Sequence, residues 1–246
     1  MDNRNQDTII LFDVDGTLTK SRNKIENDMI EILNKLKKKY YVAVVGGSDL
    51  QKISEQLTQK VIDNMDFCFC ENGLYSLQNG KFLEKRNIRD QYGNEKLNKF
   101  INRTLKLLSE IDIPVKTGTF IEYRNGMINI SPIGRNCNQQ ERDEFEQYDK
   151  IHQIRQQLIN QLKSEFQEYN FKYSIGGQVS FDVFPIGWDK TYCLKFLDQF
   201  KNIHFFGDKT DIGGNDHEIY VHERTIGYSV KNTQETINYI QKLFLQ

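Results

Sequence analysis

Two carboxylates placed two residues apart are the feature of this chain most suggestive of chemistry. Asp13 and Asp15 lie in the run Asp-Val-Asp-Gly-Thr, directly after the apolar segment Thr8–Phe12. Residues two apart in an extended segment point the same way, so both side chains can share one site at the carboxyl end of a buried strand. Carboxylate oxygens suit a hard cation such as Mg²⁺. Taken alone, the run is equally compatible with an Asx turn.

Three further polar groups stand near other expected strands. Ser48 follows a Gly-Gly pair and can offer a hydroxyl and backbone N–H groups to a phosphate at a helix start, although with Gln51 it also fits a capping box. Asp208 follows a later strand and supplies a third carboxylate. Lys190 opens the helix before that strand, where an ammonium could neutralise phosphate and nucleophile. A solvated surface lysine is the simpler interpretation of Lys190 by itself.

The middle of the chain carries a second polar set. Arg124 and Arg135 flank a hairpin signal, and arginine forks match phosphate oxygens with two donors each. Ser180 and Asp182 fall on one face of an expected strand, where a hydroxyl and a carboxylate suit sugar hydroxyls. For any one of these residues, an exposed position on a half-solvated sheet is the simpler interpretation.

Alternating apolar segments must position the first set. Strands are expected at Thr8–Phe12, Tyr41–Val45, Phe67–Cys70 and Ile203–Phe206. Helices are expected over Ile25–Leu36, Thr191–Phe200 and Ile237–Phe244. Alternation of this kind implies parallel strands joined by crossover helices, so the predicted fold class is α/β with a Rossmann-like parallel-sheet core.

The middle segment departs from that rhythm. Asn79-Gly80 and Asn125-Gly126 are hairpin signals. Strands are expected at Phe120–Tyr123, Met127–Ile130, Phe171–Ile175 and Val179–Phe184, with helices over Leu97–Leu108 and Ile151–Phe166. Hairpins mixed with helices predict an antiparallel α+β domain inserted into the core. The predicted division is core over residues 1–82, insert over 83–187 and core again over 188–246.

Composition limits the partners and the compartment. The 246 residues carry 33 basic and 34 acidic side chains, and this balance argues against a nucleic-acid or anionic-membrane surface. No apolar run approaches the roughly 20 residues of a spanning helix, and the polar start has no signal-peptide stretch. The four cysteines, Cys68, Cys70, Cys137 and Cys193, fit no zinc ribbon. We therefore expect no nucleic acid, no membrane and a reduced, cytoplasmic location.

The polar groups at the strand ends resemble the motif set of the haloacid dehalogenase superfamily. This resemblance implies that Asp13 is a nucleophile forming an aspartyl-phosphate and that Asp15 is the general acid–base. It also implies that Asp13, Asp15 and Asp208 contact Mg²⁺, and that the insert is a cap domain. A carboxylate nucleophile divides phosphoryl transfer into two easier steps, while metal and lysine neutralise the phosphoryl oxygens.

The insert resembles the cap of the eukaryotic-type phosphomannomutases, and the resemblance to that family extends through the core nearly from end to end. The matching segments are Phe12–Thr19, Val45–Asp49, Glu71–Gly73, Glu122–Arg135, Gly176–Leu194 and Phe205–Ile219. The resemblance implies a phosphate site formed by Arg22, Arg124, Arg135 and Arg142, with Ser180 and Asp182 holding the sugar. It further implies a secondary cation site near Tyr220, His222 and Thr225, where His222 replaces an aspartate of many relatives.

The implied activity is an isomerase reaction between mannose 6-phosphate and mannose 1-phosphate. It would run through a hexose 1,6-bisphosphate, which also acts as activator, and would supply mannose 1-phosphate for GDP-mannose synthesis and glycosylation. The resemblance also implies a homodimer joined through the cap domains. Glucose phosphates are further candidate substrates, because epimers differ only in the direction of one hydroxyl.

Two other functions are compatible with the same residues. A sugar phosphatase of this fold would share the core motifs, and only the arginine-rich insert disfavours it. A non-catalytic sugar-phosphate-binding protein is disfavoured by the intact set of Asp13, Asp15, Ser48, Lys190 and Asp208.

Overall fold

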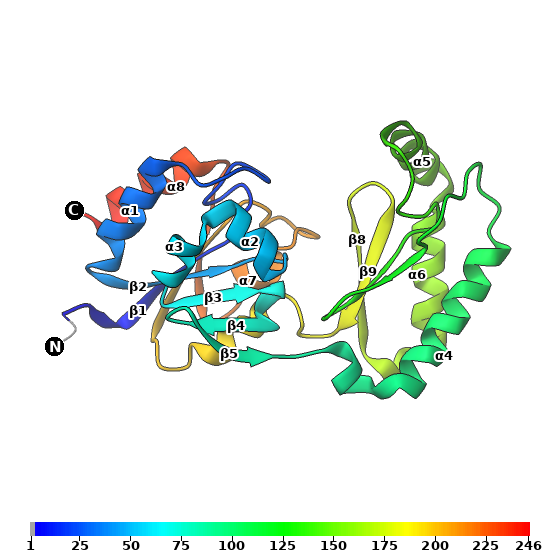
Figure 1. Ribbon diagram of the computed structural model, residues 1–246, viewed down its shortest axis with the longest axis horizontal. Coiled ribbons are helices and arrows are strands. Elements are labelled where there is room, and N and C mark those ends of the chain that lie inside the picture. The colour runs from blue at the N-terminus through cyan, green and yellow to red at the C-terminus, as the bar shows by residue number, and fades with distance from the viewer. Residues whose placement is uncertain (1–2) are drawn as a thin grey trace. The chain divides into compact units, whose positions relative to one another are not determined.

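The computed structural model describes residues 3–246, which form two compact units (Figure 1). Of the described residues, the core unit combines Asn3–Lys85 with Gly187–Gln246, and the insert unit is Arg86–Ile186. The sequence pattern predicted that the insert begins at residue 83. Strand β5 (Lys81–Lys85) instead continues the sheet of the core unit, so the insert begins directly after it.

A seven-stranded sheet of order β11-β10-β1-β2-β3-β4-β5 forms the centre of the core unit. The strands from β11 to β3 pair in parallel, which confirms the predicted α/β class with a parallel-sheet core. The remaining bounds are β1 (Asn5–Phe12), β2 (Tyr40–Val45), β3 (Phe67–Cys70), β4 (Tyr75–Gln78), β10 (Asn202–Gly207) and β11 (Thr225–Ser229).

The hairpin signal at Asn79-Gly80 belongs to this sheet. Both residues have positive φ, +50° and +72°, as the tight turn between antiparallel β4 and β5 requires. The hairpin therefore widens the parallel sheet on one side and is not part of the inserted layer.

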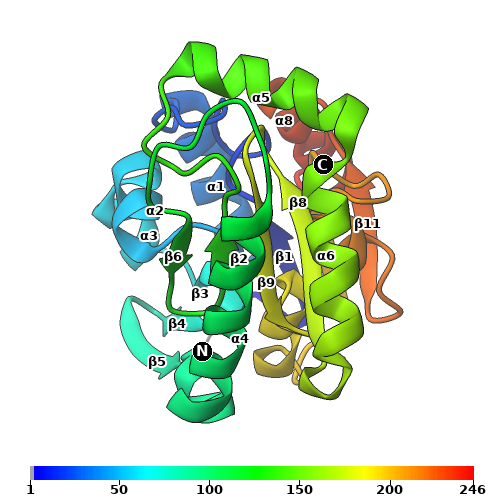
Figure 2. The ribbon, with the colours of Figure 1, turned by 90° about the vertical axis from the view of Figure 1, so that its right-hand side faces the viewer.

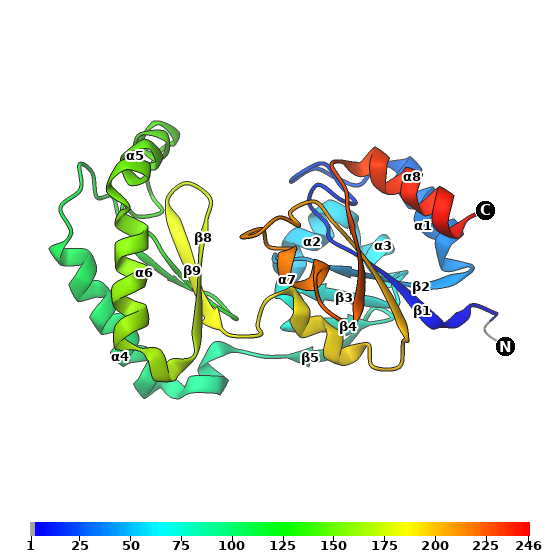
Figure 3. The same ribbon diagram turned by 180° about the vertical axis from the view of Figure 1, so that it is seen from behind.

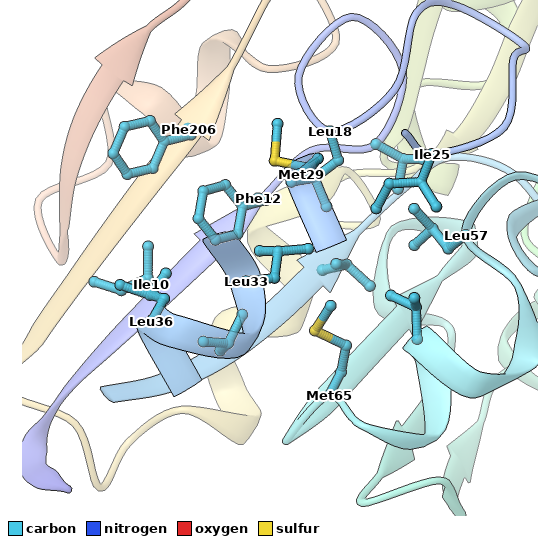
Figure 4. Close-up of a cluster of buried hydrophobic side chains, with 14 of the residues drawn as sticks. Ile10, Phe12, Leu18, Ile25, Met29, Leu33, Leu36, Leu57, Met65 and Phe206 are labelled. Carbon is cyan, nitrogen blue, oxygen red and sulfur yellow. The ribbon is translucent and has the colours of Figure 1, made fainter. Parts of the chain in front are cut away.

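Apolar side chains of the central strands alternate between two faces. Ile10 and Phe12 pack with α1 (Asn27–Lys37) and α8 (Thr233–Phe244), which lie side by side (Figures 1 and 3). Figure 4 shows this cluster, in which Phe206 stacks on Phe12. Helices α2 (Leu50–Leu57) and α3 (Gln59–Asp63) cover the same face. Ile9 and Leu11 face the other way, toward η3 (Lys190–Phe196) and α7 (His217–Tyr220).

One predicted helix of the core unit differs in type. The segment expected as a helix over Thr191–Phe200 is the shorter 3₁₀ helix η3. The Arg224 guanidinium donates to the carbonyl oxygens of Leu194 (3.0 Å) and Leu197 (3.1 Å). Carbonyls at the end of η3 thus find a partner without an α-helical turn. A second 3₁₀ turn, η1 (Glu71–Gly73), follows β3.

The insert unit is a four-stranded antiparallel sheet of order β6-β7-β9-β8. Its strands are β6 (Ile121–Tyr123), β7 (Ile128–Ile130), β8 (Phe171–Gly176) and β9 (Ser180–Pro185). Helices α4 (Ile88–Glu110) and α6 (Ile154–Glu165) lie on one side of this sheet (Figure 2). The 3₁₀ turn η2 (Gln167–Tyr169) joins α6 to β8.

The helix predicted over Ile151–Phe166 is divided. Helix α5 (Gln139–His152) ends and α6 begins at Gln153, which has a left-handed φ of +56°. The Asp149 side chain accepts from the Arg155 backbone N–H at 2.9 Å and so supports this sharp turn. Within residues 3–246, none of the helices is long and apolar enough to cross a bilayer.

Candidate active site

Four predicted groups of the core unit, Asp13, Asp15, Ser48 and Asp208, line one cavity of about 160 Å³. They arrive there because β1, β2 and β10 are adjacent and parallel, so their carboxyl ends share one edge of the sheet. The lining residues are Asp13, Val14, Asp15, Gly46, Gly47, Ser48, Ile53, Gln56, Asp208, Lys209 and Asn215.

Asp13 is held at the end of β1 by backbone and side-chain contacts. Its N–H donates to the carbonyl of Phe206 at 2.9 Å, and its Oδ1 accepts from Lys190 Nζ. The same ammonium donates to Asp216 Oδ1 at 2.5 Å. Lys190 is 1% exposed, so it is not the solvated surface lysine that its sequence position alone allowed.

The buried charges shift one another's protonation equilibria. Burial raises the pKa of the Asp13 carboxyl to about 7; Lys190 opposes this shift and Asp216 adds to it. Burial alone would lower the pKa of Lys190, but the neighbouring Asp13 and Asp216 outweigh it and raise that pKa. The pKa of Asp208 is raised too, first by burial and then by Asp216.

Asp216 is a central residue that the motif analysis missed. It is 0% exposed, and both of its oxygens accept: Oδ1 from Lys190, and Oδ2 from the backbone N–H of Lys209 at 3.0 Å. The Asp216 N–H in turn donates to the Lys209 carbonyl at 3.1 Å. Asp216 therefore both fixes Lys190 and closes the loop that follows Asp208. The sequence signal that could have identified Asp216 is that it is an additional acidic residue within the matching segment Phe205–Ile219.

The acidic groups fit a divalent cation. Asp13, Asp208 and Asp216 each offer a carboxylate oxygen, and these atoms lie within 4.8 Å of one another. In their ionised form the three carboxylates carry three negative charges, and the Lys190 ammonium balances one of them. The cluster therefore has an excess of two negative charges. Both Asp216 oxygens already accept hydrogen bonds. The predicted contacts of Asp13 and Asp208 with Mg²⁺ fit this cluster and stay predictions.

Asp15 lies in the same cavity but is engaged differently. Its Oδ1 accepts from the Arg22 backbone N–H at 2.7 Å and from Gln56 Nε2 at 2.8 Å. The cluster of close carboxylate oxygens does not include Asp15. Its predicted contact with Mg²⁺ stays a prediction, while the two hydrogen bonds fix its carboxylate. Gln56, which is buried, is a second residue that the motif analysis missed.

Ser48 lines the cavity just before α2. The cap of that helix is Asp49, whose side chain accepts from the Lys52 N–H at 2.9 Å. The capping box considered for Ser48 and Gln51 is therefore not formed. Ser48 is also tied to the turn after β3, because its carbonyl accepts from the Glu71 N–H at 2.9 Å.

The insert unit brings its predicted residues onto one face of its sheet. Asn129 Nδ2 donates to Ser180 Oγ at 3.0 Å and to Asp182 Oδ1 at 2.7 Å, and Asn129 Oδ1 accepts from Arg135 Nη1 at 2.7 Å. Glu122 Oε2 bridges Arg124 Nη2 (2.5 Å) and Arg135 Nε (3.1 Å). Apolar neighbours on the opposite face, Ile128, Ile130, Phe181 and Val183, are completely buried.

The remaining predicted arginines lie in different units. Arg142, on α5 of the insert unit, donates from Nη2 to the Arg135 carbonyl at 3.2 Å. Arg22 belongs to the core unit, is exposed and has a φ of +60°. Its side-chain role toward a phosphate stays a prediction.

The residues of the expected secondary cation site share the turn between α7 and β11. The Thr225 hydroxyl contacts the carbonyls of Ile219 (2.5 Å) and His222 (3.0 Å). His222 Nδ1 accepts from the Arg224 N–H at 3.2 Å, and Tyr220 is the last residue of α7. These contacts close the turn, and the ion itself stays a prediction.

The fold of this chain is similar to the folds of solved phosphatase and nucleotidase structures. The chain superimposes on IMP-nucleotidase of Plasmodium falciparum with a TM-score of 0.61 and 15% identity, covering 96% of this chain and 68% of the other. It superimposes on trehalose-6-phosphate phosphatase of Aspergillus fumigatus with a TM-score of 0.60 and 15% identity, covering 98% and 94%. At such identities the likeness shows a shared fold.

Relatives found by sequence share a much higher identity with this chain than these solved structures do. The family model for eukaryotic phosphomannomutase matches residues 29–246. Proteins named phosphomannomutase are 54% identical in Nicotiana benthamiana, covering 96% of this chain and 94% of the relative, and 54% identical in Glycine max, covering 97% and 96%. One from Dendrobium officinale is 55% identical, covering 96% and 94%. The chain belongs to the eukaryotic phosphomannomutase family.

Proposed function

We propose that this chain is a Mg²⁺-dependent phosphomannomutase that interconverts mannose 6-phosphate and mannose 1-phosphate through an aspartyl-phosphate on Asp13. Membership of the family supports the activity. The observation that carries the mechanism is the buried contact of Lys190 with both Asp13 and Asp216, next to a cavity that Asp13 lines together with Asp15, Ser48 and Asp208.

Asp13 is the group we assign as nucleophile. The backbone contact to Phe206 and the ammonium of Lys190 fix its carboxylate, which reduces the reorganisation needed for attack on phosphorus. Lys190 and the Ser48 hydroxyl would bind oxygens of the transferring phosphoryl group. Mg²⁺ held by Asp13 and Asp208 would supply further positive charge at those oxygens.

Asp15 is the group we assign to proton transfer. Both observed hydrogen bonds, from Arg22 N–H and Gln56 Nε2, reach Oδ1. Oδ2 is therefore the atom we assign to take the proton from the attacking sugar hydroxyl and to return it to the leaving oxygen in the reverse step.

The reaction requires the sugar to present either end to Asp13. A hexose 1,6-bisphosphate first phosphorylates Asp13, and the aspartyl-phosphate then transfers its group to the free hydroxyl of a bound monophosphate. The new bisphosphate reorients and donates its other phosphate. We assign Arg22, Arg124, Arg135 and Arg142 to the phosphate that is not reacting, and Ser180 and Asp182 to the sugar hydroxyls.

Several finer points belong to the same proposal. The product mannose 1-phosphate would serve GDP-mannose synthesis and glycosylation, with glucose phosphates as further substrates and glucose 1,6-bisphosphate as one candidate activator. We also propose a cytoplasmic homodimer joined through the insert units. A secondary cation at Tyr220, His222 and Thr225 remains part of this proposal.

A sugar phosphatase is the second candidate, because the core groups would serve hydrolysis equally well. It differs in whether water reaches the aspartyl-phosphate. The test follows mannose 6-phosphate and free phosphate together, starting from mannose 1-phosphate, Mg²⁺ and catalytic glucose 1,6-bisphosphate. Mannose 6-phosphate without free phosphate, and its absence in Asp13→Asn, supports the mutase. Free phosphate alone establishes the phosphatase. If neither mannose 6-phosphate nor free phosphate forms, the result favours a non-catalytic binding protein.

A further inference from the structure

A buried asparagine lies at the centre of the polar face of the insert sheet. Asn129 on β7 is 3% exposed and stands in register between Glu122 on β6 and Asp182 on β9. Ser174 on β8 continues the same row beyond Asp182. The row therefore crosses all four strands of the sheet, with Asn129 between the arginine side and the serine–aspartate side.

The orientation of the Asn129 amide is fixed by its neighbours. A guanidinium can only donate, so Arg135 Nη1 must meet the amide oxygen, at 2.7 Å. An ionised carboxylate can only accept, so Asp182 Oδ1 must meet the amide nitrogen, also at 2.7 Å. A flipped amide would place oxygen against oxygen and nitrogen against nitrogen.

This orientation decides which atoms a ligand can use. Ser180 Oγ accepts from Asn129 Nδ2 at 3.0 Å, so the serine proton points away from Asn129 and can be donated. Asp182 accepts from Asn129 through Oδ1, which directs Oδ2 to accept from another donor. Arg135 is held by Asn129 at Nη1 and by Glu122 at Nε, which leaves Nη2 to bind an anion.

We propose that Asn129 is a positioning residue that couples the phosphate-binding arginine to the sugar-binding pair. It sets Ser180 as a donor, Asp182 as an acceptor and Arg135 as a restrained cation before the substrate arrives. Asn129 acts through these three side chains and does not itself contact the sugar phosphate. The inference rests on the proposed function for the identity of the ligand, whereas the coupling between the side chains does not depend on it.

The test replaces the amide by an isosteric carboxylate in the full-length chain. In Asn129→Asp, an acceptor faces Asp182 and Ser180 in place of a donor. We expect the KM for mannose 1-phosphate to rise about tenfold or more, while kcat at saturating substrate stays within about threefold. Asn98→Asp, an exposed change on α4 of the same unit, is the matched control and should leave both constants unchanged.

A substrate-free measurement tests the coupling separately. Urea unfolding of Asn129→Ala, Asp182→Ala and the double variant should give changes in stability that do not add. If Asn129→Asp does not fold, Asn129→Ser removes the amide without adding charge and takes its place in the kinetic test.

The outcomes separate this inference from the proposed function. An unchanged KM in a folded Asn129 variant overturns the inference. A rise in KM that comes with matching falls in kcat and in thermal stability also overturns it, because it indicates a structural role alone. Strict additivity in urea also overturns it. A wild-type chain without mutase activity overturns the proposed function instead, and the urea cycle still decides whether Asn129 couples the side chains.

Discussion

The Lys190 ammonium and the Asp216 carboxylate, 26 residues apart in the chain, form a completely buried hydrogen bond of 2.5 Å. Lys190 also contacts Asp13, so one ammonium lies between the assigned nucleophile and the Asp216 carboxylate. The position of Lys190 depends on Asp216 as much as on Asp13. This relationship makes Asp216 a more sensitive residue than its place outside the core motifs suggests.

Asp216→Asn should therefore lower activity without removing the nucleophile. The amide keeps the shape but weakens the charge-assisted contact with Lys190, and we expect kcat to fall about tenfold to a hundredfold. Asp211→Asn, an exposed change in the same loop, is the control and should retain full activity. Equal kinetics of Asp216→Asn and wild type would show that Asp13 alone positions the lysine.

Gln56→Leu should affect the proton-transfer step. Gln56 Nε2 donates to Asp15 Oδ1 at 2.8 Å, and removing this donor frees the assigned acid–base to rotate. We expect kcat for mutase turnover to fall about tenfold, as for the loss of a hydrogen bond to a charged group. Gln51→Leu, exposed on the same helix α2, should leave kcat unchanged. An unaffected kcat in Gln56→Leu would remove Gln56 from the site.

Gly16→Ala should weaken magnesium binding. Gly16 has a φ of +80°, and a Cβ built there would overlap the carboxylate of Asp208. Gly213 has a similar φ of +89° with nothing within 4 Å of its Cβ position, so Gly213→Ala carries the same backbone strain without the overlap. Titrating Mg²⁺ against activity should show a higher half-saturating concentration only in Gly16→Ala. Equal curves for the two variants would mean that Asp208 moves aside freely.

Two ion pairs of the insert unit should differ in their effect on stability. Arg155 and Asp149 are both buried and paired at 2.7 Å, with Arg155 also donating to the Gly177 and Ser180 carbonyls. Arg155→Met leaves the Asp149 charge buried and should lower the free energy of unfolding by about 3–5 kcal/mol. Arg103→Met, in the more exposed pair with Glu165, should lower the free energy of unfolding far less, because water screens that pair. Urea unfolding of both variants compares them directly.

The stability of the core unit should fall at mildly acidic pH through His204. Burial lowers the pKa of His204, whose Nδ1 lies 3.0 Å from the Tyr228 hydroxyl. The unfolded chain, with a histidine pKa of about 6.5, then binds more protons than the folded one as pH falls through that value. The contribution of neutral, buried His204 to the stability of the folded chain is therefore complete above about pH 6.5 and is lost as the pH falls below that value.

Melting temperatures measured from about pH 7.5 to pH 5.5 check this expectation. His204→Gln should show a shallower decline than wild type over that range. His152→Gln, at an exposed position on α5, should follow the wild-type curve. Parallel curves for His204→Gln and wild type would assign the pH dependence to other groups.

The strands of the core sheet could be predicted because their signals are local. Continuous apolar runs at Thr8–Phe12 and Phe67–Cys70 mark strands buried on both faces, and the structure has strands there. Where local signals were ambiguous, the expectation was wrong in detail. Gln153 adopts a left-handed φ within an otherwise helical pattern, and the segment after Lys190 is held as a 3₁₀ helix by Arg224, far along the chain.

The sequence by itself determined the family, the α/β class and which strand ends carry Asp13, Asp15, Ser48 and Asp208. A parallel sheet brings those ends to one edge whatever the details of packing, so spacing and residue type were sufficient. Only the tertiary structure decided the partners of these groups: Asp216 for Lys190, Gln56 for Asp15 and Asn129 for Asp182. Each partner comes from a different segment of the chain, so its side chain reaches the group only when tertiary packing brings the two segments together.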